Sequence, residues 1–289
     1  MALTPRGLVL RNVLLAATAV AVVLAVVLLV RGHGTPFRSA SCRATANGET
    51  FELSPEQMAN AATIAGISVK RGLPARAATI AIATARQESK LTNVNYGDRD
   101  SLGLFQQRPS QGWGTAAQVR DPVYATNAFY DVLVKIDGYR SMEITKVAQK
   151  VQRSAFPEAY AEHEPEGRVY ASALTGQSVA ALTCRLDPSS PPGGSTAVPG
   201  YLTALAREQA PARPTRLDGV EGVRLAAPDR AHAWSLAQYS VGSAQRFGVA
   251  RVYVDGRLWD RSKPDQGWVK SSDGGSGVVV LFANQRPPT

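Results

Sequence analysis

The sequence predicts a mainly α-helical domain between a single N-terminal transmembrane helix and a small C-terminal α+β domain. Three observations lead to this prediction: an apolar run over residues 13–30, several helical patterns around one polar segment within residues 53–186, and mixed helix and strand patterns after residue 200. We therefore divide the chain into a cytoplasmic tip with the transmembrane helix (1–31), a stalk (32–52), the helical domain (53–186), a linker rich in Pro, Gly and Ser (187–200), and the α+β domain (201–289).

The apolar run over residues 13–30 is long enough to span a bilayer and longer than the usual core of a signal peptide. Arg6 and Arg11 precede it without an acidic residue, which favours a cytoplasmic N-terminus and an exported remainder. No cleavage site of small residues follows closely. We expect an uncleaved single-pass anchor rather than a cleaved signal peptide, with most of the chain on the extracytoplasmic side.

The formal net charge of +9 arises largely beside this membrane helix, because five Arg residues precede Glu49, the first acidic residue. The remaining excess could attract the chain towards an anionic envelope, but no nucleic-acid-binding module is recognisable. His33, His163 and His232 are scattered, without the spacing of metal ligands. We predict no nucleic-acid partner, no metal and no cofactor.

The two cysteines, Cys42 and Cys184, bracket the helical domain. In an oxidising, exported compartment this placement predicts a disulfide that ties the ends of the domain together. The alternative is a pair of buried free thiols.

The helical domain begins with a recognisable helix start. Ser54 is suited to the N-cap, Pro55 to the first turn and Gln57 to a capping box, and Gly72 ends the pattern. A second helix follows from about Pro74 and is apolar nearly all round, which is typical of a central, buried helix.

Glu88 continues the apolar stripe of this second helix, on the same face as Ile80 and Thr84. Removal from water raises the pKa of a carboxyl group, and a carboxylic acid still protonated near neutral pH can donate a proton. This is the role of the general acid in glycoside hydrolysis. The alternative is a solvated Glu at a helix end, paired with Lys90 or Arg86.

The remaining elements follow from local patterns. Residues 92–120 are rich in Asn, Asp, Gly, Ser and Gln and predict loops, a composition that also suits a binding site. Further helices are expected over 121–135 and 145–153, around 158–160 and 169–171, and over 229–246; strands are expected over 249–254 and 278–282, with a hairpin turn at Asp255-Gly256.

The segment Gln87-Glu88-Ser89, followed by Gly103-Leu104-Phe105-Gln106, resembles the lysozyme-like superfamily, in particular bacterial lytic transglycosylases and goose-type lysozymes. Tyr96-Gly97-Asp98-Arg99 resembles a further stretch of the goose-type enzymes, and the resemblance covers roughly residues 50–180. It implies that residues 53–186 form a mainly α lysozyme-like domain in a bacterial envelope protein. It also implies that Glu88 is the catalytic acid, that the Gly-Leu-x-Gln turn shapes the sugar cleft, and that peptidoglycan glycan strands are the partner.

One departure from the goose-type pattern bears on the reaction. Those enzymes carry an Asp two residues after the Gly-Leu-x-Gln motif, where this chain has Arg108. The pair that activates water is therefore incomplete, which favours transglycosylase chemistry. Asp98 is the best second carboxylate and would support hydrolysis if it reached the opposite face of the sugar; its alternative role is to cap its own loop.

Several residues near these motifs are candidates for substrate binding. The Gln106 amide suits the acetamido group of a sugar. Gly103 could let the backbone approach the sugar or could simply form a turn, and Ser89 could orient the acid or the substrate or be a simple helix-end hydroxyl. Tyr96 and Phe105 could stack on sugar faces, although aromatic side chains near such loops are as often part of the core. Weaker candidates are Gln152 and Tyr160.

These residues predict a peptidoglycan-cleaving, lytic transglycosylase-like enzyme with Glu88 as general acid and base. Two alternatives stay open. One is a hydrolytic muramidase that uses Asp98, and the other is a catalytically inactive lysozyme-like module that binds or scaffolds the cell wall. The sequence indicates no protein partner.

Overall fold

The computed structural model describes residues 39–152, 157–187, 197–209, 212–217 and 220–283. The chain separates into two compact units, Met1–Ser39 and Ala40–Thr289, and nearly all described residues belong to the second. The membrane helix predicted over residues 13–30 and most of the predicted linker lie outside the described residues. Within the described part, no helix combines the length and apolarity needed to cross a membrane.

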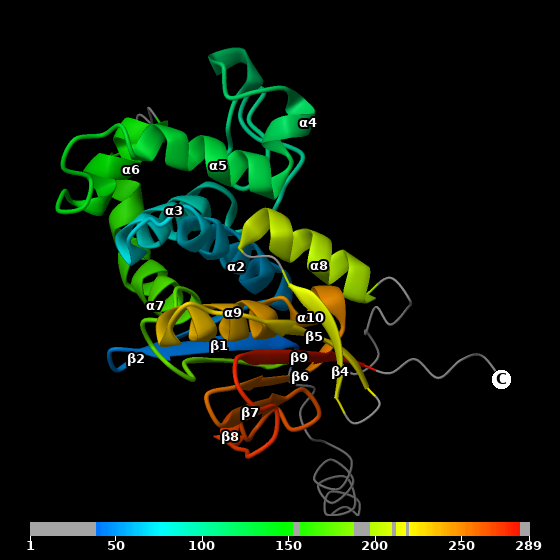
Figure 1. Ribbon diagram of the computed structural model, residues 1–289. Helices are drawn as coiled ribbons and strands as arrows, with labels where there is room; N and C mark the ends of the chain where they lie inside the picture. Colours follow the sequence, from blue (N-terminus) through cyan, green and yellow to red (C-terminus); the bar gives the residue numbers. More distant parts are fainter. Residues whose placement is uncertain (1–38, 153–156, 188–196, 210–211, 218–219, 284–289) are drawn as a thin grey trace, which may run out of the picture. The chain divides into compact units, whose positions relative to one another are not determined.

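The prediction of a mainly α fold is wrong. The part of the chain that the structure describes is mixed α/β, 46% helical and 21% strand, with two antiparallel sheets. A three-stranded sheet has the order β2-β1-β3, and a six-stranded sheet has the order β4-β5-β9-β6-β7-β8 (Figure 1). Most of these strands are not predicted from the sequence, because they are short and carry exposed polar residues that leave little signal in local periodicity.

The small sheet joins two segments that bracket the helices. β1 (Ser41–Ala46) turns back into β2 (Glu49–Leu53) through Asn47 and Gly48, both in the left-handed conformation. β1 also pairs with β3 (Leu182–Arg185), which places Cys42 directly opposite Cys184. These two residues form a disulfide, the pair that their placement predicted. The segment interpreted as a stalk therefore ends in a sheet.

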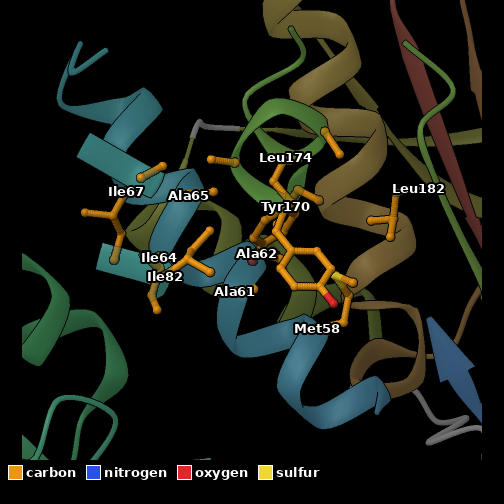
Figure 2. Packing of buried hydrophobic residues seen from close by; sticks show 14 of the residues in the cluster. Met58, Ala61, Ala62, Ile64, Ala65, Ile67, Ile82, Tyr170, Leu174 and Leu182 are labelled. Atoms are coloured by element: carbon orange, nitrogen blue, oxygen red, sulfur yellow. The ribbon is translucent and has the colours of Figure 1, made fainter. Parts of the chain in front are cut away.

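Two helices form the centre of the protein. α2 (Pro55–Lys70) begins with the predicted capping box of Ser54 and Gln57. α3 (Ala75–Ser89) is buried continuously from Ala77 to Ala85, as its all-round apolar pattern predicted. Figure 2 shows side chains of α2, among them Met58, packed against Tyr170 of α7 (Glu164–Leu174).

The polar segment after α3 contains only short elements. They are an isolated bridge between Leu102 and Gln107, the 3-10 helix η1 (Pro109–Gln111) and the short helix α4 (Ala116–Val119). The chain then continues through α5 (Pro122–Leu133), which is capped by Asp121, α6 (Ile144–Gln152), the 3-10 helix η2 (Pro157–His163) and α7. The predicted order of helices is confirmed here, except that η2 is a 3-10 helix and α7 is longer than expected.

The C-terminal part contains a larger sheet than predicted. Its helices are α8 (Ala197–Glu208), α9 (Arg230–Gly242) and α10 (Ala244–Phe247). Its strands are β4 (Arg213–Leu217), β5 (Val220–Leu225), β6 (Val249–Val254), β7 (Arg257–Asp260), β8 (Trp268–Lys270) and β9 (Val278–Phe282). The predicted hairpin at Asp255-Gly256 connects β6 and β7. The predicted single helix over 229–246 is divided between α9 and α10.

Helix α9 joins the C-terminal part to the central helices. It contacts α2 and α7 on one side and strands β6 and β9 of the larger sheet on the other (Figure 1). The buried Gln238 accepts hydrogen bonds from the backbone N–H groups of Ala181 and Leu182, and Trp268 donates to the Leu182 carbonyl at 2.8 Å. Helix α9 therefore belongs to a core shared by both parts of Ala40–Thr289.

Candidate functional site

Glu88 lies in the last turn of α3 and is half-buried. Its Oε1 accepts a hydrogen bond of 2.7 Å from the hydroxyl of Tyr160, whose side chain is fully buried in η2. Burial raises the pKa of the Glu88 carboxyl above its usual range, and hydrogen bonds from Tyr160 and Gln152 oppose this shift. Its place at the negative end of a helix dipole also disfavours the carboxylate form.

The end of α3 is fixed by contacts with α2. Lys90 and Leu91 both adopt the left-handed conformation that ends the helix. Gln57 donates a hydrogen bond to the Lys90 carbonyl and Asn60 donates one to the Leu91 carbonyl, each at 2.8 Å. Two polar side chains of α2 thus satisfy backbone acceptors at the turn that follows Glu88, and they set where α3 stops.

Ser89 connects Glu88 to the Gly-Leu-Phe-Gln turn. Its hydroxyl donates to the Leu104 carbonyl at 2.8 Å and lies 3.1 Å from the Ala85 carbonyl. Gln152, at the end of α6, donates from Nε2 to the Phe105 carbonyl at 2.6 Å. The Gln152 Oε1 is buried and has no hydrogen-bond partner among the described residues. Ser89 and Gln152 therefore both hold the turn beside the acid, and Gln152 offers a buried acceptor there.

The turn itself is shaped by packing within the loop. Gly103 has a φ of 76°, and an added Cβ would lie 2.2 Å from the Val119 carbonyl oxygen. The close approach of α4 therefore requires a glycine at position 103. This contact accounts for the glycine without the predicted approach of its backbone to a sugar. The Gln106 amide donates to the Tyr96 carbonyl at 3.2 Å, so Gln106 stabilises the loop.

The two aromatic candidates for sugar stacking differ sharply in exposure. Phe105 is fully buried and stacks on Phe129 with 4.7 Å between ring centroids, so the expectation that Phe105 contacts a sugar is wrong. The reason is that the turn points this side chain into the core. Tyr96 is 72% exposed and is available to a ligand.

The acidic residues of the loop have separate roles. Asp98 is exposed, and its carboxylate makes no hydrogen bond or ion pair within the described part of the chain. Asp100 accepts from Arg108 Nε at 2.9 Å and from the Ser110 N–H at 2.8 Å, and the Arg108 guanidinium holds the pKa of Asp100 well below its usual range. Arg108, which replaces the second Asp of the goose-type pattern, therefore neutralises Asp100.

The structure gathers Glu88, Ser89, Gln152 and Tyr160 around the end of α3, and it places Gln106 and Tyr96 in the adjoining loop. Tyr160, a weak candidate in the sequence, directly contacts the acid. Sequence reasoning missed a polar cluster of Arg86, His163 and Glu166 beside this site. Its only local signal is a run of polar residues at the end of an otherwise apolar helix.

Within the described ranges, no group of three or more His, Cys, Asp and Glu side chains is placed to hold a metal ion. A scan against models of protein families finds no match to this chain, and a search of curated proteins finds none either.

Proposed function

We propose that this chain is a peptidoglycan-cleaving enzyme of the lysozyme-like superfamily that acts as a lytic transglycosylase, with Glu88 as general acid and base. The observation that carries the proposal is the environment of Glu88: a half-buried carboxyl with a raised pKa, at the end of an apolar helix, held by a buried tyrosine. The motifs that carry the resemblance lie on α3 and in the loop after it, so the proposal does not require a mainly α fold.

The chemistry requires one carboxyl group for two steps. Protonated Glu88 would donate its proton to the oxygen of the β-1,4 bond between N-acetylmuramic acid and N-acetylglucosamine as the bond from that oxygen to the anomeric carbon breaks. The 6-hydroxyl of the muramic sugar would then attack the same anomeric carbon and lose its proton to the Glu88 carboxylate. The products are an alcohol and an internal anhydro sugar, and Glu88 is protonated again.

The pairing of Asp100 with Arg108 supports the transglycosylase over the hydrolase, because this carboxylate is already engaged by a guanidinium and a backbone N–H. The exposed Asp98 stays the candidate for water activation in the hydrolytic alternative. The Cys42–Cys184 disulfide supports the proposed location on the extracytoplasmic side of a bacterial cell membrane, because disulfides persist in oxidising compartments.

The test compares the full chain with its Glu88→Gln variant on purified peptidoglycan, with soluble muropeptides measured by mass spectrometry. We expect the variant to lose roughly 10²–10⁴-fold in rate, the usual contribution of a general acid. The matched control is Glu143→Gln, which makes the same change at an exposed carboxylate paired with Lys146 and should leave the rate unchanged.

The product mass distinguishes the two enzymatic reactions, because the anhydro product is lighter than the hydrolytic product by one water. Equal release by wild type and Glu88→Gln would reject catalysis by Glu88. If wild type releases no muropeptide but sediments with intact peptidoglycan, the chain is the inactive binding module instead.

A further inference from the structure

Three consecutive residues at the end of α3 each make a polar contact with the segment formed by η2 and the start of α7. Arg86 Nε lies 2.9 Å from Glu166 Oε1, Gln87 Oε1 lies 2.9 Å from His163 Nε2, and Glu88 accepts the hydrogen bond from Tyr160. We name this set of contacts the α3 clamp; its members are Arg86, Gln87, Glu88, Tyr160, His163 and Glu166.

We propose that His163 and Glu166 are positioning residues of the site, which hold η2 against α3 so that Tyr160 meets the carboxyl of Glu88. This inference rests on the proposed function and adds to it the means by which the acid is oriented. His163 and Glu166 do not contact the substrate in this proposal. They affect Glu88 only through the position of Tyr160.

His163 lies at the centre of the clamp. Its Nδ1 is 2.9 Å from Glu166 Oε1, and its Nε2 faces Gln87 Oε1, with Glu162 Oε1 at 3.6 Å. Both ring nitrogens are engaged, which fixes the orientation of the imidazole. The same Glu166 oxygen also receives Arg86, and only 12% of the Glu166 side chain is exposed. The charged groups that face His163 are thus Glu162 and Glu166, with Arg86 behind Glu166.

Apolar packing already secures the body of α7 against α3. Val169, Ala173 and Leu174 are buried, and Gly167 allows so close an approach that an added Cβ would lie 3.0 Å from the Thr79 carbonyl oxygen. The polar contacts of the clamp are therefore not needed to dock α7. They act at its N-terminal end, where η2 presents Tyr160 and where 3-10 geometry provides poorer backbone hydrogen bonds than an α-helix.

The first experiment measures the pKa of Glu88 by ¹³C NMR in the full chain, with the Glu88→Gln spectrum used for assignment. Tyr160→Phe removes a hydrogen bond to the carboxylate, so the pKa of Glu88 should rise by about one unit. His163→Ala should raise it in the same direction. The double variant should match Tyr160→Phe alone, because His163 acts through Tyr160.

A direct effect of a charge on His163 would instead persist in the Tyr160→Phe background. Additive shifts in the double variant, or an unchanged pKa of Glu88 in His163→Ala, would overturn the positioning role. Glu166→Gln provides a second, less disruptive variant if His163→Ala does not fold, and it should shift the pKa of Glu88 upwards as well.

The second experiment measures kinetics on peptidoglycan. His163→Ala should lower kcat about tenfold with KM within about twofold, since misplacement of a catalytic group reduces the rate rather than binding. His163→Gln should restore part of the loss, because its amide can still reach one of the two partners. The control is Arg168→Ala, which breaks an exposed ion pair with Glu164 on the same helix and should leave both constants unchanged.

A loss in Arg168→Ala equal to that in His163→Ala would show a general disturbance of α7 and reject the inference. The two proposals can fail separately. If wild type does not cleave peptidoglycan, the proposed function fails while the NMR experiment still decides whether the clamp positions Tyr160. If wild type cleaves and the pKa of Glu88 is independent of His163, the clamp fails and the function stands.

Discussion

Glu88 is subject to opposing effects on its protonation. Burial and the end of the α3 dipole favour the neutral acid, whereas hydrogen bonds from Tyr160 and Gln152 favour the carboxylate. The balance leaves the pKa of Glu88 above its usual range, so a larger fraction of the carboxyl is protonated near neutral pH. The proposed mechanism needs both forms, because the group donates a proton and then takes one back.

The pH dependence of activity should follow this balance. The acid form is needed for bond cleavage, so activity falls as pH rises through the pKa of Glu88, and the raised pKa extends activity to higher pH. Tyr160→Phe should move this basic limb upwards by about one pH unit and lower the maximal rate. The readout is kcat against pH on peptidoglycan; Tyr253→Phe, a buried tyrosine of β6, is the control and should keep the wild-type limb.

Some residues of the candidate site could be placed from their spacing in the sequence, and others could not. The position of Glu88 on an apolar helix face predicted its partial burial, because a helix has a fixed period. Spacing could not place Phe105, since an identical motif can turn its side chains towards a ligand or towards the core. Tyr160 stands 72 residues from Glu88, and no periodicity relates the two.

At the scale of elements, the Gly-Leu-Phe-Gln turn depends on a glycine at position 103. Gly103→Ala combines a left-handed backbone with a contact of 2.2 Å to the Val119 carbonyl oxygen. We expect a loss of about 3 kcal/mol or more in unfolding free energy, measured by urea titration.

Gly48→Ala is the matched control for this substitution. Gly48 in the β1–β2 turn also has a positive φ, but an added Cβ would meet no atom within 4 Å. Its cost should be only the backbone strain, about 1 kcal/mol. Equal losses for the two variants would mean that the contact with Val119 relaxes freely.

Elements with strong local signals were the ones predicted well. The capping box at Ser54 and Gln57 and the hairpin at Asp255-Gly256 are encoded by a few adjacent residues. Strands β4 and β5 were missed because they are edge or near-edge strands with many exposed polar residues. Strand β1 lies in the segment predicted to be a stalk, although Asn47-Gly48 is a hairpin signal that indicates strands on either side of it.

At the scale of the whole molecule, a buried carboxylate holds α8 against the centre. Glu208 is 2% exposed, and its Oε2 accepts hydrogen bonds from Thr63 at 2.7 Å and from Tyr239 at 2.8 Å. It thereby links α2, α8 and α9. This contact joins residues from both predicted domains. Without Glu208 of the C-terminal part, the buried Thr63 hydroxyl of the helical part would lose its hydrogen-bond acceptor.

Glu208→Ala would leave two buried hydroxyl groups without their acceptor. We expect a loss of about 3 kcal/mol in unfolding free energy, within one cooperative transition, measured by denaturant titration of the full chain. Glu221→Ala, which removes an exposed partner of Arg216 at 3.6 Å, should cost less than about 1 kcal/mol. Two separate transitions would contradict the shared core.

The disulfide has a mechanical consequence. Cys42 and Cys184 are adjacent across β1 and β3, and they close a loop with a sequence separation of 142. A load applied from the N-terminal side enters β1 and passes to β3 through the disulfide bond, so α3, which carries Glu88 and lies between these strands in the sequence, does not bear the load. In single-molecule pulling, roughly 470–510 Å of contour length should remain hidden until a reductant opens the bond.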